Sequence, residues 1–262
     1  MLECVVNISE GRDRQVIGRV AAAAGRDLLD LHTDPHHHRS VLTLVGEDAA
    51  RAVATEAVDR IDLRDHHGAH PRIGALDVVP FVPLDGATMH DAVAARDQFC
   101  GWAGEQLGLP CFAYGPERSL PDVRRLAFAG LEPDAGPAQP HESAGAVAVG
   151  ARPLMVAYNV WLAEPDLALA RRVASEVRGP TIRTLGLAVG DRVQVSMNLL
   201  DPLALGPDAA SDAVAERAHI AGCELVGLVP RAVLDAIAPE RWEALDLVED
   251  RTIEARLAAR AG

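Results

Sequence analysis

Residues 184–200 read TLGLAVGDRVQVSMNLL, in which two apolar runs, 184–189 and 193–200, flank Gly190-Asp191. A short connection of glycine and aspartate between two β-prone runs is typical of an antiparallel hairpin. Parallel strands instead require a crossover of about a dozen residues or more. The segment therefore predicts a hairpin and argues against a single doubly wound parallel sheet.

This hairpin belongs to an order of elements that occurs twice. Periodicity predicts strand, helix, strand, strand, helix and strand at residues 2–8, 13–24, 28–31, 41–45, 48–61 and 75–82, followed by a helix at 91–107 and a strand at 111–114. A second run begins near residue 147 and comprises the apolar segment 147–161, a helix at 165–177, the hairpin, a helix at 208–221, a strand at 225–229 and a mostly helical tail at 231–259.

We therefore predict an α/β (α+β) fold with two similar βαββαβ-type subdomains, each a sheet covered by helices, and a cleft between them. The segment 130–145 is rich in Pro, Gly and Ala and has little periodicity, which is typical of a linker or binding loop. The expected subdomains are residues 1–145 and 146–262.

The composition limits the class of partner. The chain has 262 residues, a formal net charge of −13 and 25 basic residues, all of them arginine. An acidic surface argues against nucleic acid or an anionic membrane as a partner, whereas a few converging arginines can still bind a small anion. The four cysteines form no CxxC pair, and the chain shows neither a signal-peptide pattern nor an apolar run of membrane-spanning length. These features predict a cytoplasmic protein.

Histidines gather in two turn-prone segments of the first subdomain, at residues 32–38 and 66–70. Each segment adjoins a predicted strand, so the two can meet at one edge of the sheet. Three interpretations are open: metal ligands, general acid–base catalysts, or solvated loop residues. Solvation is the default interpretation for His36, His37, His66 and His67.

General acid–base catalysis fits His70 best. Pro71 restricts the backbone of His70 towards extended geometry and so holds the imidazole in a defined direction. Gly68 and Gly74 allow a ligand to approach the backbone closely. Arg72 supplies a planar, permanent cation that suits a carboxylate.

Arg39 follows the first histidine segment and offers the same guanidinium chemistry as Arg72. A surface salt bridge is the alternative for both arginines in so acidic a chain. No nucleophile elbow and no Walker or dinucleotide glycine pattern competes with the histidine segments.

Several motifs in a fixed order resemble the formiminotransferase domain family. The opening ECVVNISEG resembles the family's ECVPNFSEG, and GAHPRIGALDV resembles GEHPRMGALDV. The matching segments of this chain are residues 3–11, 68–78, 80–83, 145–152, 198–201 and 225–230. They extend through almost the whole chain, and their order is more specific than any one motif.

The resemblance implies transfer of a formimino group from N-formiminoglutamate to tetrahydrofolate, which gives glutamate and 5-formiminotetrahydrofolate. Tetrahydrofolate is then the co-substrate and no metal is required. The resemblance also implies a homodimeric transferase of histidine degradation and one-carbon metabolism. By motif position, His70 matches the catalytic histidine and residues 136–145 match the segment that lines the folate site.

The site predicted on these grounds has three groups of residues. The catalytic residues are His70 and Asp34; the substrate-binding residues are Asn7, Arg39, Gly68, Arg72 and Gly74; the folate-binding residues are Gly136, Pro137, Ser143, Ala144 and Gly145.

The chain departs from the family pattern at three positions. It has His38 where asparagine is usual, His32 where an ungapped alignment places an aspartate, and Ala144 where an aromatic residue is familiar. Asp34 takes the place of that aspartate if the loop shifts slightly. The departures leave two alternatives open: a non-catalytic folate- or anion-binding paralogue on the same fold, and a metal-dependent hydrolase that uses both histidine segments. The absence of a cyclodeaminase domain implies a separate cyclodeaminase.

Overall fold

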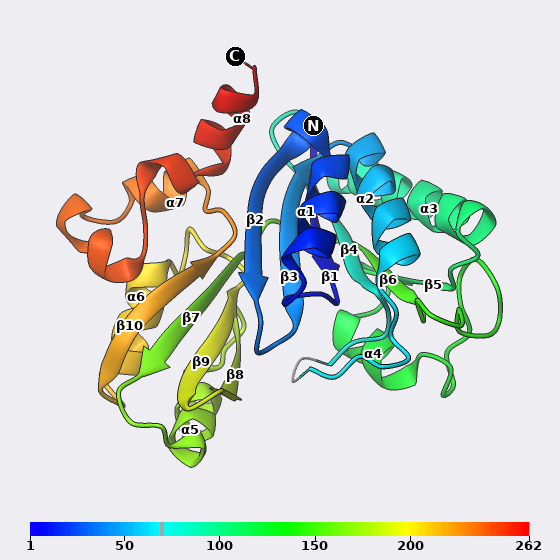
Figure 1. Ribbon diagram of the computed structural model, residues 1–262. Coiled ribbons are helices and arrows are strands. Elements are labelled where there is room, and N and C mark those ends of the chain that lie inside the picture. Colours follow the sequence, from blue (N-terminus) through cyan, green and yellow to red (C-terminus); the bar gives the residue numbers. More distant parts are fainter. Residues whose placement is uncertain (69–70, 262) are drawn as a thin grey trace. The chain divides into compact units, whose positions relative to one another are not determined.

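The computed structural model describes residues 1–68 and 71–261, which form two compact units, Met1–Pro153 and Leu154–Gly262 (Figure 1). Each unit contains one sheet with helices packed on it. The predicted mixed α/β fold with two sheets is therefore confirmed.

The first unit has a six-stranded sheet in the order β2-β3-β1-β4-β6-β5. Its strands are β1 (Leu2–Ile8), β2 (Leu28–Asp34), β3 (Arg39–Val45), β4 (Leu76–Pro83), β5 (Cys111–Tyr114) and β6 (Val147–Ala151). The central strand β1 is antiparallel to both β3 and β4, whereas β6 is parallel to β4 and β5.

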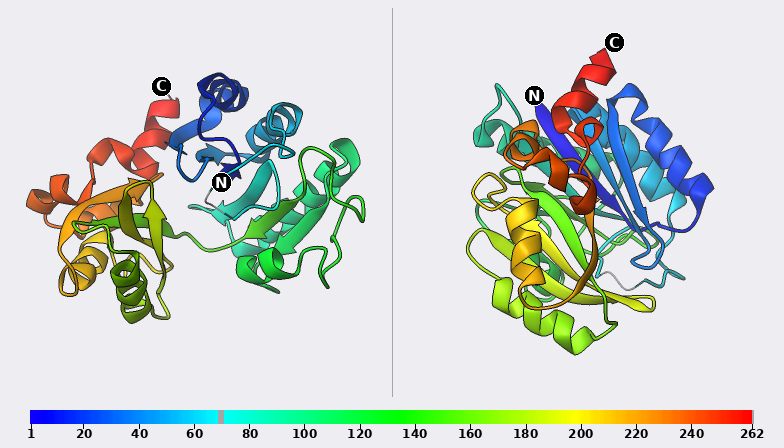
Figure 2. Two further views of the ribbon diagram at one scale, coloured as in Figure 1. Left: turned by 60° about the horizontal axis from the view of Figure 1, so that its bottom comes forward. Right: turned by 90° about the vertical axis from the view of Figure 1, so that its left-hand side faces the viewer.

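Helices cover both faces of this sheet. They are α1 (Arg14–Ala23), α2 (Glu47–Arg60), α3 (Met89–Gln106) and α4 (Leu120–Leu126). Successive residues of a strand point to opposite faces, and along β4 Val79 joins the core under α1, α2 and α3 while Val78 joins a second core under α4. Figure 2 (left) shows α4 on the face opposite the other three helices. The near-continuous apolar run of β4 is thereby explained, because both of its faces are covered.

Helix starts in this unit follow local capping chemistry. The carboxylate of Asp13 accepts from the Gln15 and Val16 N–H groups at the start of α1. Thr88 and Asp91 form a reciprocal capping box at the start of α3. These side chains satisfy N–H groups that have no partner within the helix.

The second unit repeats the order of the first. Its elements are β7 (Val156–Leu162), α5 (Leu167–Val177), β8 (Ile182–Val189), β9 (Arg192–Leu199), α6 (Pro207–Ala215) and β10 (Ile220–Val226). Its strand order β10-β7-β9-β8 corresponds to β4-β1-β3-β2, with antiparallel pairing throughout. The predicted hairpin is confirmed, since Val189 pairs with Arg192 across its turn. The tail contains α7 (Arg231–Asp235), α8 (Ile253–Ala261) and three short 3₁₀ turns, at 239–241, 243–245 and 249–251.

The structure differs from expectation in several places, and the strand expected at 225–229 is observed at Ile220–Val226. Strand β6, which follows the expected boundary at residue 145, pairs with β4 and β5, so the units divide between Pro153 and Leu154. The helix expected at 208–221 ends at Ala215, because residues from Ile220 onward pair with β7. Helix α4 was not predicted. Among the helices of residues 1–68 and 71–261, none is both long enough and apolar enough to cross a bilayer.

Candidate active site

The two histidine segments of the first unit meet, as the sequence suggested. The rings of His38 and His66 lie with their centroids 4.0 Å apart at an interplanar angle of 36°. Gly68 explains why the segments can approach so closely. A Cβ on Gly68 would lie 2.7 Å from Cβ of His38 and 2.6 Å from Nη2 of Arg72, so a side chain at this position would push the two segments apart.

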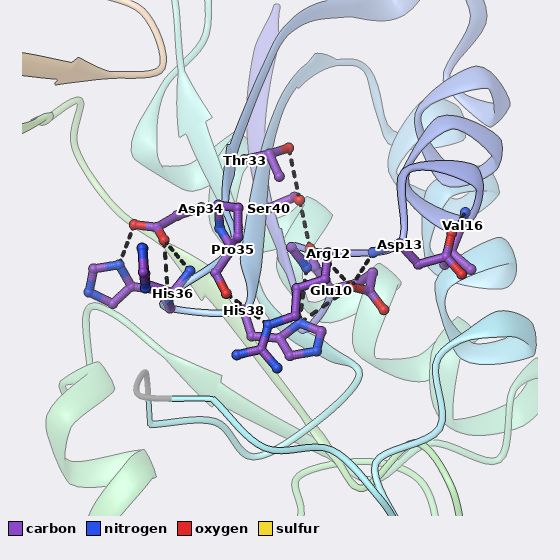
Figure 3. A network of polar contacts seen from close by, with 12 residues as sticks. Glu10, Arg12, Asp13, Val16, Thr33, Asp34, Pro35, His36, His38 and Ser40 are labelled. Atoms are coloured by element: carbon purple, nitrogen blue, oxygen red, sulfur yellow. Dashed lines mark hydrogen bonds and ion pairs between the residues drawn. The ribbon is translucent and has the colours of Figure 1, made fainter. Parts of the chain in front are cut away.

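His38 is held as a neutral imidazole by the loop after β1. Its Nδ1 accepts a hydrogen bond from the Gly11 N–H at 3.1 Å, which requires a lone pair on that nitrogen. Burial lowers the pKa of His38; Glu10 opposes this effect, and the charges of Arg12 and Arg72 add to it. Figure 3 shows His38 between Glu10 and Arg12, with Ser40 tied to the Glu10 carbonyl.

His66 is not the solvated loop residue that the sequence suggested. Both of its ring nitrogens lie below the surface, and neither makes a well-formed hydrogen bond with the residues that the structure describes. Burial lowers the pKa of His66, and the charges of Arg72 and His38 lower it further. The adjacent His38 and His66 rings therefore favour two neutral imidazoles over two charged ones.

Asp34 ends β2 and organises the turn that carries the histidines. Its Oδ1 accepts from the backbone N–H groups of His36 and His37 at 2.8 and 3.0 Å, and its Oδ2 lies 2.5 Å from Nδ1 of His37. Burial alone would raise the pKa of Asp34, but the hydrogen bonds from His37 outweigh burial and hold the pKa well below its usual range. His37 is buried by this pairing, contrary to expectation.

The two predicted anion-binding arginines each lie near other arginines and near Asp77. Burial lowers the pKa of both Arg39 and Arg72, while the charge of Asp77 raises it. Arg124 opposes Asp77 in both cases, and Arg12 also acts on Arg72. Guanidinium groups stay protonated under such shifts. A chain with a formal charge of −13 thus places several arginines close to one carboxylate, Asp77.

The segment that follows residue 70 is anchored on both sides. Ile73 N–H donates to Oδ1 of Asp77 at 2.8 Å, and Oγ of Ser9 donates to the Gly74 carbonyl at 2.7 Å. Arg124 donates to the Pro71 carbonyl at 2.6 Å. Sequence reasoning gave no role to Asp77 or Arg124. A charged residue inside an apolar strand was the available signal for Asp77, because a buried carboxylate needs partners.

Part of the predicted folate segment lies directly beside this anchored loop. Ala75 N–H donates to the Ala144 carbonyl at 2.9 Å. Gly145 has φ 70°, and a Cβ there would overlap the Ile73 carbonyl oxygen. Ala144 is fully buried in the core, and its N–H donates to Nδ1 of His141. Both backbone groups and the side chain of Ala144 are therefore already engaged within the protein.

The remaining predicted residues are less closely grouped. Gly136 packs against Gly104 and the Leu109 carbonyl, Pro137 is exposed, and the Leu63 N–H donates to the Ser143 carbonyl at 2.8 Å. Asn7, on β1, is half-buried and donates from Nδ2 to the Val5 carbonyl at 3.0 Å. His70 lies outside the described residues. Within residues 1–68 and 71–261, no group of three or more His, Cys, Asp or Glu side chains is arranged to hold a metal ion.

Comparison with known proteins identifies the family. Residues 1–152 match the model of the formiminotransferase domain, N-terminal subdomain. The chain is 35% identical to glutamate formimidoyltransferase of Streptococcus pyogenes serotype M1, over 91% of this chain and 92% of that protein. It is also 35% identical to glutamate formimidoyltransferase of Thermoplasma acidophilum, over 91% of each protein. With formimidoyltransferase-cyclodeaminase of Sus scrofa it shares 34% identity, over 91% of this chain and 52% of that protein. The chain belongs to the formiminotransferase domain family, a family of group-transfer enzymes.

Proposed function

We propose that this protein transfers a formimino group from N-formiminoglutamate to tetrahydrofolate, giving glutamate and 5-formiminotetrahydrofolate. The observation that carries the proposal is the alignment with two proteins named glutamate formimidoyltransferase over 91% or more of both partners. The arginines near Arg72 add a physical reason, because both substrates carry carboxylates that a guanidinium can bind.

The proposed reaction needs one group that both accepts and donates a proton. N5 of tetrahydrofolate attacks the formimino carbon and loses its proton to His70 as the tetrahedral intermediate forms. The bond from that carbon to the glutamate nitrogen then breaks, and the proton passes to the leaving nitrogen. An imidazole that titrates near neutral pH serves both steps. Binding both substrates together removes part of the entropic barrier, and neither a metal nor a covalent enzyme intermediate is required.

We assign the carboxylate of the donor to Arg72 and Arg39, with Asn7 on the neighbouring strand. Gly68 and Gly74 are the positions where the ligand approaches the backbone. We infer that Asp34 acts through the turn that it caps, because its two oxygens already bind the His36 and His37 N–H groups and the His37 ring.

We place the folate along the segment from Gly136 to Gly145. Pro137 would contact it through its exposed side chain and Ser143 through its backbone, and Ala144 lies in the core behind the segment. The protein would act as a cytoplasmic homodimer in histidine degradation and one-carbon metabolism. Its product, 5-formiminotetrahydrofolate, would then be the substrate of a cyclodeaminase.

The test is an assay of the purified chain with N-formiminoglutamate and tetrahydrofolate, run beside His70→Ala and the control His67→Ala. His67 is exposed and close in sequence, so its loss should leave turnover intact, whereas His70→Ala should lose about 100-fold or more. No turnover by the wild type with intact folate would remove the substrate assignment. Full activity of His70→Ala would remove the mechanism alone.

A further inference from the structure

Arg124, on helix α4, contacts the segment that follows His70. Its Nη1 donates to the Pro71 carbonyl at 2.6 Å, and its Nη2 donates to Oδ2 of Asp77 at 2.6 Å. A guanidinium is planar and presents its terminal nitrogens as a rigid fork. One side chain therefore joins the loop at residue 71 to strand β4.

Asp77 completes this connection from the strand. Its side chain is 1% exposed, and its Oδ1 accepts from the Ile73 N–H at 2.8 Å. Taking a carboxylate out of water is costly unless it is paired and hydrogen-bonded. Arg124 and the Ile73 N–H supply hydrogen bonds to this buried carboxylate, so the position of residues 71–73 and the burial of the charge depend on each other.

The pair holds the backbone on both sides of Arg72. Pro71 is fixed through its carbonyl and Ile73 through its N–H, so the direction in which Arg72 leaves the backbone is set by two anchors. His70 immediately precedes the first anchor. The other cations around Asp77, which are Arg39 and Arg72, are themselves stabilised by its charge.

We propose that Arg124 and Asp77 are positioning residues for group transfer: they fix residues 71–73, which include Arg72 and the residue to which His70 is covalently joined. Neither residue touches the substrate in this role. The inference rests on the proposed function, since it takes His70 as the proton-transferring group and Arg72 as the anion-binding group.

The neighbouring residue Arg125 provides a matched control. It carries the same charge on the same helix, but its side chain is 67% exposed and pairs with Asp122 within α4. Arg124→Gln keeps a polar side chain and loses the fork, Arg124→Lys keeps the charge, and Arg125→Gln removes an equal charge without touching the loop. Each variant is made in the full chain.

Two measurements test the proposal. The first is kcat and KM for tetrahydrofolate and N-formiminoglutamate. We expect Arg124→Gln to lower kcat about 10- to 100-fold with a small change in KM for tetrahydrofolate, because a displacement of about 1 Å is costly in rate. Arg124→Lys should recover part of the loss, and Arg125→Gln should match the wild type. The second is hydrogen exchange of a peptide spanning residues 68–78. Exchange should be faster than in the wild type in Arg124→Gln and unchanged in Arg125→Gln.

The outcomes separate this inference from the proposed function. Unchanged exchange, or faster exchange with wild-type kcat, would overturn the positioning role. If Arg124→Gln does not unfold cooperatively, Arg124→Lys takes its place, with smaller changes in the same direction expected. If the wild type turns over neither substrate, the proposed function fails, and hydrogen exchange alone decides whether the pair holds the loop.

Discussion

The backbone N–H of Gly11 donates to Nδ1 of His38 over 3.1 Å and so ties the loop after β1 to the turn between β2 and β3. Oε1 of Glu10 lies 3.3 Å from the same nitrogen. A neutral imidazole accepts from Gly11, whereas a protonated one must donate instead, and Glu10 is the acceptor in reach. Protonation of His38 thus exchanges a backbone contact for an ion pair and loosens the Gly11 loop.

This exchange predicts a dependence of stability on pH. Burial and the charges of Arg12 and Arg72 keep the pKa of His38 below its ordinary value despite Glu10. A folded-state pKa below the unfolded value of about 6.5 means that the contribution of neutral His38 is complete above about pH 6.5 and is lost as the pH falls through the folded pKa. We expect the free energy of unfolding of the wild type to fall between about pH 7 and pH 5.

His38→Asn is the informative variant, because the asparagine oxygen can accept from Gly11 without titrating. Its free energy of unfolding, measured by urea denaturation across the same pH range, should fall less steeply than that of the wild type. The neighbouring ring of His66 also has a lowered pKa, so some pH dependence should remain. Parallel curves for the two proteins would contradict the assignment.

Substitution by alanine should change the free energy of unfolding in opposite directions at two glycines. A Cβ on Gly74 would overlap the Ala146 carbonyl oxygen, whereas a Cβ on Gly101 meets nothing within 4 Å. Gly101 lies inside α3, where alanine is favoured over glycine by about 1 kcal/mol. Gly74→Ala should therefore lower the free energy of unfolding by about 2 kcal/mol or more, and Gly101→Ala should raise it. Thermal or urea denaturation checks both, and equal effects would show that the contact between residues 74 and 146 is easily relaxed.

Asp34 should stabilise the protein in a different pH range from His38. The hydrogen bonds from His37 keep its pKa below the usual value in spite of burial. A lowered carboxyl pKa contributes stability above the unfolded value of about 3.9, and this contribution is lost as the pH falls through the folded pKa. We expect Asp34→Asn to cost about 1–2 kcal/mol at neutral pH and to lose less stability than the wild type between about pH 5 and pH 3. A cost that stays constant over that range would rule out the ionised form of Asp34 as its source.

The parts of the fold that the sequence predicted correctly depend on patterns within short stretches of chain. The repeated βαββαβ order follows from helical and strand periodicity and from the Gly190-Asp191 turn, all of which lie within short windows of sequence. The partner of β6 could not be predicted in this way, because residues 148–151 pair with residues 78–81 across a long stretch of chain. Helix α4 has seven residues, too few to show a helical period.

The candidate site shows the same difference between features set by single residues and features set by contacts between distant segments. Motif and glycine reasoning singled out the loop with Gly68, Arg72 and Gly74 as a candidate, since the residue type of each suggests a role. The contact of His38 with His66 and the burial of His37 against Asp34 depend on two loops meeting. Solvent exposure was the reasonable expectation for those histidines individually, and only the packing of one loop on the other overturns it.

The two tyrosines of the chain, one in each unit, allow the contribution of a buried hydroxyl hydrogen bond to be measured. The hydroxyl of Tyr158 donates to the Leu245 carbonyl at 2.8 Å, and its ring is fully buried. The Tyr114 hydroxyl has no hydrogen-bond partner within residues 1–68 and 71–261, although Tyr114 is also buried. Removing one partner of a buried hydrogen bond leaves the other unsatisfied, at a cost of about 1–3 kcal/mol.

Tyr158→Phe should therefore lower the free energy of unfolding by about 1–2 kcal/mol, whereas Tyr114→Phe should change it little. Because Leu245 lies in the tail and Tyr158 on β7, hydrogen exchange in residues 239–251 should accelerate in Tyr158→Phe and remain unchanged in Tyr114→Phe. Equal destabilisation by the two variants would mean that the loss arises from packing of the rings and not from the bond to Leu245.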